Sequence, residues 1–366
     1  MVTPALKLDD PIEDVAERLG KLFSSVPISR EPMFSWLHIT NDATVLGEEL
    51  RRDRREDAAD RAGRILIRLL EFLGYYLYCH QPSEHDHLAN LVAKTLRQAS
   101  FEEEIKDLKE GPSRWILWKF PYSCSKCGQR PCHCMVYPLV LENRREDPER
   151  YVEMFKEKAS EARKKLNGKE LKPFTLQSLF EHFGSIFENS YHYQDPWKIG
   201  MHLYEEIGEA TTELSRIYLQ LRAQEANFKI KDALAKTFGL SKQKLDLETG
   251  KITNVSARNK RAQEIDIELQ KLRADFEEKP WDRFEKLVRD KFKEEVSDVF
   301  SWIAAVILRL DPKLEKFKAL LKLLSREGEF GAHELVCKYC RQPACDNVCL
   351  VTHSVSAEIT EKLSKF

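Results

Sequence analysis

Glycine is scarce in this sequence, and no long apolar run occurs. Only 14 of 366 residues are glycine, and neither a G-x-x-x-x-G-K-[ST] loop nor a G-x-G-x-x-G turn is present, which excludes phosphate binding by a glycine-rich loop. The most apolar stretch, residues 65–77, is short and contains Arg68 and Glu71, so we expect no membrane-spanning helix. Five acidic residues among the first 17 are incompatible with the apolar stretch of a signal peptide, and we expect none.

The chain also has no excess of either charge. It contains 59 Lys and Arg against 60 Asp and Glu, a net charge of −1, which argues against binding nucleic acid or anionic membranes through the overall field. A hydrophobic fraction of 42% is sufficient for a buried core, and a charged fraction of 33% with so little glycine favours long, solvent-flanked helices. Strand patterns are few, so we predict an all-α fold.

Two segments resemble each other. HITNDATVLGEELRR from His38 aligns without a gap on HLYEEIGEATTELSR from His202, and each segment precedes a second apolar helix and then a cysteine cluster. Duplication of one unit explains the shared order, and chance similarity between amphipathic helices is the alternative. The predicted parts are a lead-in (1–33), a first helical unit (34–119), a first cysteine cluster (120–136), a helical connector (137–172), a second helical unit (173–326) and a second cysteine cluster with a tail (327–366).

Four carboxylates occupy matching positions in the second unit. Glu206 and Glu209 lie three residues apart, each directly before a core position, and Glu295 and Asp298 repeat this spacing on a later helix. Pairing the two apolar stripes brings the four acids together, where they repel one another unless a divalent cation is bound. Oxygen ligands favour Mg²⁺ or Mn²⁺, which in turn favour phosphate-bearing substrates. The alternative is ordinary exposed acids paired with nearby bases, namely Lys291, Lys293 and Arg216.

Glu205-Glu206-x-x-Glu209 followed by Glu295-x-x-Asp298 resembles the signature of the MazG-like all-α nucleoside triphosphate pyrophosphohydrolases. The similarity covers residues 174–326 apart from an insertion. It implies a four-helix core that assembles as dimers or larger oligomers, and Mg²⁺-dependent cleavage of a nucleoside triphosphate to a monophosphate and pyrophosphate. It also implies that Glu206, Glu209, Glu295 and Asp298 are metal ligands. Glu205 is then a further ligand or a neighbour that contacts the ligands. Two Mg²⁺ ions would then clamp the triphosphate and activate a water.

One departure from the family concerns spacing. The two halves of the motif are separated by 85 residues, more than the family usually has and more than compact helix connections need. We interpret residues 223–280 as an insertion that acts as a lid, a partner-binding arm or an oligomerisation hairpin. With this insertion, the motif does not define which base and sugar the nucleotide carries.

The first unit keeps the short spacing and loses part of the acidic set. Asn41, Asp42 and Val45 stand in place of Glu205, Glu206 and Glu209, and Asp60 and Gly63 in place of Glu295 and Asp298. Valine and glycine cannot ligate a metal, so we interpret this unit as a degenerate, non-catalytic copy. The resemblance then suggests a pseudo-dimer within one chain, or a homo-oligomer, and an unrelated helical domain is the alternative.

Eight of the nine cysteines form two clusters, and Cys79 stands apart. The clusters read Cys124-x2-Cys127-x4-Cys132-x-Cys134 and Cys337-x2-Cys340-x4-Cys345-x3-Cys349. Four thiolates at such spacing are typical of a structural, tetrahedral Zn²⁺ site, and tight clustering favours a reduced, cytoplasmic protein. His133 in place of one cysteine, ligands shared between the clusters, or disulfides are the alternatives.

Three further side chains lie one turn from the acids. We predict that His202 and Lys291 contact substrate phosphates and that Trp302 stacks on a base; capping, salt bridging and core packing are the respective alternatives. The rival function is a non-enzymatic, zinc-containing helical adaptor. It binds protein or single-stranded nucleic acid through basic side chains near the cysteines. A third interpretation keeps the enzyme but regulates it through the degenerate unit or the insertion.

Overall fold

The structure is a computed structural model that describes residues 4–24, 31–84, 86–99, 105, 108–125, 128–132, 157, 160–166, 170–193, 195–219, 279–327 and 333–336. The chain divides into two compact units: Met1–Leu214 with Arg289–Phe366, and Ser215–Val288. The fold and site below belong to the first unit.

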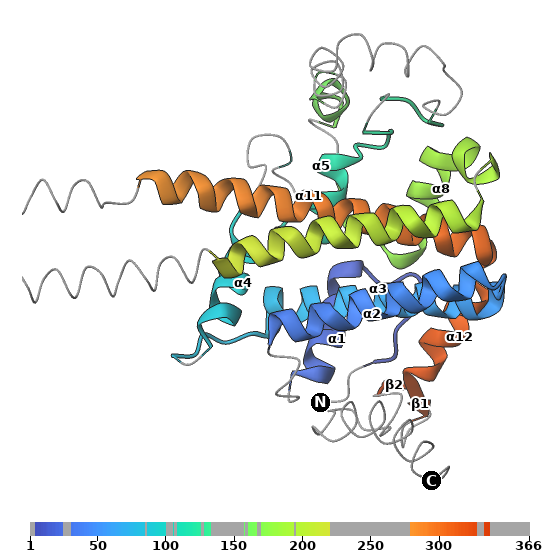
Figure 1. Ribbon diagram of the computed structural model, residues 1–366, viewed down its shortest axis with the longest axis horizontal. Helices are drawn as coiled ribbons and strands as arrows, with labels where there is room; N and C mark the ends of the chain where they lie inside the picture. The colour runs from blue at the N-terminus through green and yellow to red at the C-terminus, as the bar shows by residue number, and fades with distance from the viewer. Residues whose placement is uncertain are drawn as a thin grey trace, which may run out of the picture. The chain divides into compact units, whose positions relative to one another are not determined.

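The described chain is mostly helical, as the sequence predicts (Figure 1). Its helices are α1 (Ile12–Phe23), α2 (Pro32–Arg51), α3 (Arg55–Gly74), the π-helical turn η2 (Tyr75–Cys79), α4 (His87–Arg97), α5 (Pro112–Lys119), α8 (Leu176–Tyr193), α11 (Lys279–Leu310) and α12 (Glu315–Leu323), and residues 196–219 are also helical. Two three-residue strands, β1 (Ser325–Glu327) and β2 (His333–Leu335), pair antiparallel with Ser325 opposite Leu335. Among the described residues, no helix is both long and apolar enough to span a membrane.

Helices α2 and α3 form an antiparallel pair because of their local sequence. Pro32 occupies the first turn of α2, where its missing N–H costs nothing. Asp53 adopts a φ of 53° in the short turn between the helices, a conformation that Asp tolerates better than most residues. The buried positions of α2 recur every three or four residues and include Trp36, Ile39, Ala43 and Leu46.

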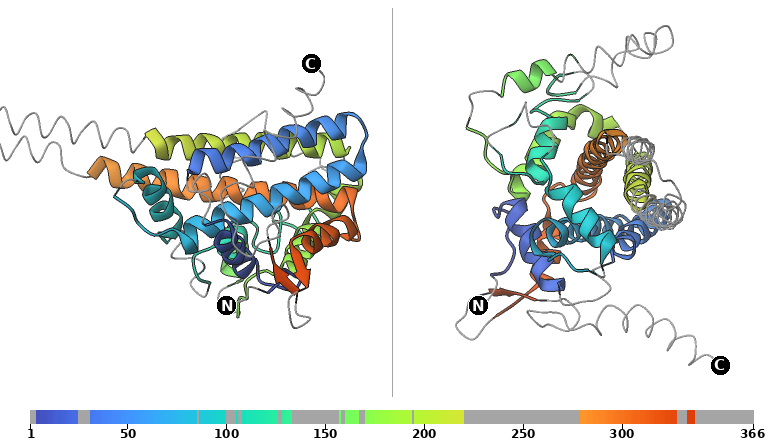
Figure 2. Two further views of the ribbon diagram at one scale, coloured as in Figure 1. Left: turned by 90° about the horizontal axis from the view of Figure 1, so that it is seen from below. Right: turned by 90° about the vertical axis from the view of Figure 1, so that its left-hand side faces the viewer.

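Trp36 connects α2 to three other helices. Its ring packs edge-on against Phe72 of α3 at 5.1 Å and lies 5.8 Å from Phe292 of α11. Its indole N–H donates a 2.7 Å hydrogen bond to Thr211 Oγ1 in the 196–219 helix. The helix pairs that the sequence assigns to two separate copies therefore contact each other within the first unit, where the four helices run side by side (Figure 2).

The first copy pairs or replaces the acids that the second copy has at these positions. The side chain of Asp42 is buried, and its two oxygens accept hydrogen bonds from Arg61 (2.7 Å) and Arg68 (2.5 Å). A Cβ added to Gly63 would lie 3.0 Å from Leu320 and 3.2 Å from Phe317 of α12. Arginines thus neutralise one acid position, and an apolar helix covers another.

Helix α1 crosses α3 and η2 at very short range. A Cβ on Gly74 would overlap the carbonyl oxygen of Ala16, and one on Gly20 would lie 2.5 Å from backbone atoms of Gly74 and Tyr75. Only glycine permits this backbone contact. Gly47 of α2, in contrast, has nothing within 4 Å of such a Cβ.

We expect Gly74→Ala to lower the free energy of unfolding by about 3 kcal/mol, because rigid backbone must move to admit the methyl group. Gly47→Ala, the matched control, should raise it by about 0.5–1 kcal/mol, since alanine is the better helix former. Urea unfolding followed by circular dichroism measures both changes. Equal effects of the two substitutions would show that the α1–α3 contact is not this close.

Candidate metal centre

The site lies between the 196–219 helix, up to Leu214, and α11, from Arg289 onward. The apolar stripe predicted on each helix is buried: Ile199, Leu203, Ile207, Ala210 and Leu214 on one, and Phe292, Val296, Val299 and Ile303 on the other, are all 0% exposed. Burial of both stripes fixes how the helices are rotated about their axes. The residues directly before the stripe positions therefore lie at the edge of the helix interface.

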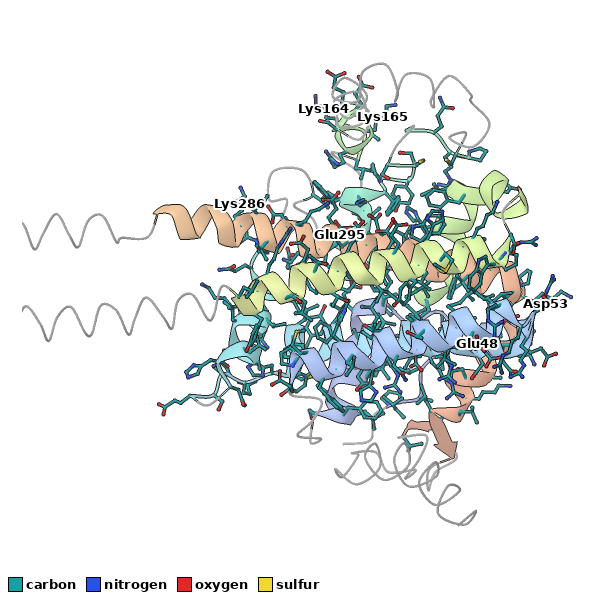
Figure 3. The ribbon with its side chains drawn as sticks, viewed as in Figure 1. Glu48, Asp53, Lys164, Lys165, Lys286 and Glu295 are labelled. Atoms are coloured by element: carbon teal, nitrogen blue, oxygen red, sulfur yellow. The ribbon has the colours of Figure 1, made fainter. Side chains whose placement is uncertain are left out.

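Three of the predicted acids converge there. Glu206, Glu209 and Glu295 each offer a carboxylate oxygen, and these oxygens all lie within 4.8 Å of one another. Glu295, labelled in Figure 3, is the buried member, with a side chain 3% exposed. Glu209 faces Glu295 closely enough for the Glu295 carboxylate to raise the pKa of the Glu209 side chain. The structure thus brings together carboxylates that lie 89 and 86 positions apart in the sequence.

The facing residues follow one antiparallel register. Glu209 faces Glu295, and Glu206 is close enough to Asp298 for their charges to interact. One turn further, the rings of His202 and Trp302 stack at 4.6 Å with 21° between their planes. The stacked pair therefore lies beside the acids. The predicted base-binding Trp302 contacts the predicted phosphate-binding His202, which also lies 3.4 Å from Glu205.

Asp298 has a different partner from the other predicted ligands. Its Oδ2 atom lies 2.5 Å from Nζ of Lys119, the last residue of α5, and the same ammonium donates to Glu294 Oε1 at 2.8 Å. The predicted phosphate-binding Lys291 pairs with Glu295 at 2.6 Å and Glu294 at 3.2 Å. The sequence analysis did not identify Lys119, because it lies 179 positions from Asp298 and belongs to no motif.

The electrostatics of the cluster reflect unbalanced negative charge. Burial, followed by the charges of Asp298, Glu209 and Glu295, raises the pKa of Glu206 to about 8. Burial and Glu295 raise the pKa of Glu209 as well, and burial raises that of Asp298 despite Lys119. Glu294 is the exception. Burial alone would raise its pKa, but Lys119 and Lys291 together lower the pKa below its ordinary value. Five carboxyl groups thus face two ammonium groups, and the excess favours either protons or a cation.

The first cysteine cluster is only partly described. Cys124 and Cys132 are buried, and a tight loop links Cys124 to its neighbours: its N–H donates to Gln129 O at 3.0 Å and its carbonyl accepts from Gly128 N–H at 2.9 Å. Gly128 has a φ of 67°, which suits glycine. Cys127, His133, Cys134 and all four cysteines of the second cluster lie outside the described residues, so both zinc sites stay predictions.

Comparison with known proteins adds no relative. No family model, curated protein or solved structure matches the chain. The resemblance to MazG-like pyrophosphohydrolases therefore depends on the acidic motif and its spacing.

The raised pKa of Glu206 predicts how stability depends on pH. Between its ordinary value of 4.5 and about 8, the unfolded chain releases this proton while the folded chain keeps it, so without divalent cations stability should fall as pH rises through this window. Glu206→Gln should remove part of that loss and raise the melting temperature above wild type at pH 8.5, but not at pH 4.

The exposed neighbour supplies the matched control, since Glu205→Gln should leave the pH profile unchanged. Thermal unfolding across pH 4–9 in buffer free of added divalent ions measures the effect. Parallel profiles for wild type and Glu206→Gln would contradict the assigned environment of Glu206.

Proposed function

We propose that the chain is a Mg²⁺-dependent nucleoside triphosphate pyrophosphohydrolase that releases pyrophosphate and a nucleoside monophosphate. The observation that carries the proposal is the convergence of Glu206, Glu209 and Glu295 on one site between two antiparallel helices. The acidic signature predicts this convergence for the pyrophosphohydrolase family, and an unrelated pair of amphipathic helices would have no reason to bury Glu295 among other acids.

The donor set suits a hard divalent cation. All three groups are carboxylates on helices, and the site contains no thiolate or imidazole ligand among the described residues. Such oxygen donors favour Mg²⁺ or Mn²⁺ over Zn²⁺ or Cu²⁺. The raised pKa values of Glu206 and Glu209 reflect burial and repulsion between carboxylates, and a bound cation would relieve that repulsion. A bound Mg²⁺ would supply polarisation of phosphoryl oxygens and a more acidic water.

The surrounding side chains suit a nucleotide. Lys119 and Lys291 place two ammonium groups against the acids, where the phosphates of a metal-bound triphosphate would lie. The stack of His202 on Trp302 offers an aromatic surface one turn away, suited to a base. In this proposal Glu206, Glu209 and Glu295 hold the ion, Asp298 completes the acidic motif, and Glu205 lies on the exposed edge beside His202.

The first copy has a supporting role in this proposal. Trp36 of α2 donates its hydrogen bond to Thr211, two residues beyond Glu209, so the first copy contacts the helix that carries half of the acids. Its own acid position is neutralised by Arg61 and Arg68. We propose one active and one degenerate MazG-like unit per chain, arranged as an intrachain pseudo-dimer. Two structural zinc sites and a cytoplasmic location complete the proposal.

Glu206→Gln should lower pyrophosphate release by at least about 100-fold, because partners outside the ligand set alone are worth about 10–100-fold at metal sites. Asp60→Asn, at the position in the first copy that corresponds to Glu295, should leave the rate unchanged. The measurement is pyrophosphate release from ribo- and deoxyribonucleoside triphosphates with Mg²⁺, with Mn²⁺ and without divalent ions.

Metal-dependent release from one or a few nucleotides in the wild type would support the proposal and identify the base and sugar. Absence of release from every nucleotide by a folded, zinc-loaded chain would refute it and favour the adaptor. Full activity of Glu206→Gln would refute the assignment of the site.

A further inference from the structure

Among the described residues, Lys119 places an ammonium group in the acidic site from outside the two helices that carry the acids. Its Nζ lies between Asp298 Oδ2 at 2.5 Å and Glu294 Oε1 at 2.8 Å, and its side chain is only 14% exposed. Lys291 differs in both respects: it belongs to the same helix as the acids, and its side chain is 42% exposed. Lys291 can therefore swing into solvent, whereas Lys119 is held.

The element that carries Lys119 is rigidly anchored. In α5, Trp115, Ile116 and Leu117 are 0% exposed. At its N-terminus the Ser113 N–H donates to Glu13 Oε1 at 2.9 Å, and Ser113 Oγ accepts from the N–H of Phe174, also at 2.9 Å. Lys119 is the last residue of the helix, where the helix dipole favours a cation. The ammonium is therefore fixed in position before any ligand arrives.

The ammonium group of Lys119 lies beside Asp298, the fourth carboxylate of the acidic motif. In two-metal sites the ions lie about 3.5–4 Å apart, so a second ion needs ligands beyond the first three carboxylates. Here the carboxylate of Asp298, which is near Glu206 in the antiparallel register, is already bonded to Lys119. A second divalent ion beside Asp298 would face strong repulsion from the ammonium at this range.

We propose that Lys119 takes the place of a second metal ion, so that the acidic site binds one divalent cation, held by Glu206, Glu209 and Glu295, with the Lys119 ammonium as its fixed positive partner. Asp298 then positions Lys119 and does not ligate the ion. The inference rests on the proposed function, and it adds that a polyphosphate is held between one metal ion and one lysine.

Counting bound Mn²⁺ by electron paramagnetic resonance on the full chain tests the inference without measuring activity. The number assigned to the site is the difference from the Glu206→Gln/Glu209→Gln double variant, which cancels ions bound elsewhere. We expect one Mn²⁺ in the wild type, two in Lys119→Met, and one again in Lys119→Arg. Lys291→Met, which removes the same charge from the same cluster, should stay at one.

Two Mn²⁺ ions in the wild type, none, or an unchanged count of one in Lys119→Met would overturn the inference. If Lys119→Met does not fold, Asp298→Asn decides: its Mn²⁺ affinity should stay within threefold of wild type, and a loss of tenfold or more would make Asp298 a ligand. Failure of this inference is distinguishable from failure of the proposed function. A chain that binds one Mn²⁺ and releases no pyrophosphate refutes only the proposed function. A chain that releases pyrophosphate with two Mn²⁺ ions bound refutes only this inference.

Discussion

The arrangement of the candidate site depends on unbalanced negative charge at the edge of a buried helix interface. Two apolar stripes fix the rotation of the 196–219 helix and of α11, and this rotation forces Glu206, Glu209 and Glu295 together. Glu295 is buried in this interface, whereas Glu206 is half-buried and Glu209 is exposed. Part of this charge is balanced by Lys291, which lies on the same helix as Glu295, and by Lys119 from α5. The rest raises the pKa values of Glu206 and Glu209.

The two helix pairs that the sequence analysis aligns differ in how their acids are balanced. In the first pair, Asp42 contacts Arg61 and Arg68, Asp60 contacts Arg64, and the glycine position is packed by Phe317 and Leu320. The acids at these aligned positions therefore have arginine partners within the first pair. In the second pair, acids outnumber bases, and the excess favours either protons or a cation. Trp36 joins the two helix pairs, because it contacts Phe72, Phe292 and Thr211 on the three other helices. The first pair therefore packs against both helices that carry the acids.

Sequence periodicity was sufficient to predict the all-α class, the buried stripes and the convergence of three acids, because a helix places residues three apart on one face. The helix 32–51 and the helix 55–74 match the pair expected in the first copy. Lys119 was not predictable, since its place depends on how α5 packs through Trp115 and its neighbours, and no local spacing encodes that packing. For the same reason Asp298 was assigned with the other acids although its nearest partner is an ammonium. Six of the eight clustered cysteines lie outside the described residues, so the zinc sites stay predictions.

Anomalous diffraction from crystals grown with Mn²⁺ and a non-hydrolysable nucleoside triphosphate tests the central claim most directly. The account predicts Mn²⁺ density at about 2.0–2.2 Å from oxygens of Glu206, Glu209 and Glu295, with the phosphates on its open side. Crystals in which excess Mn²⁺ leaves these three carboxylates without anomalous density would contradict it.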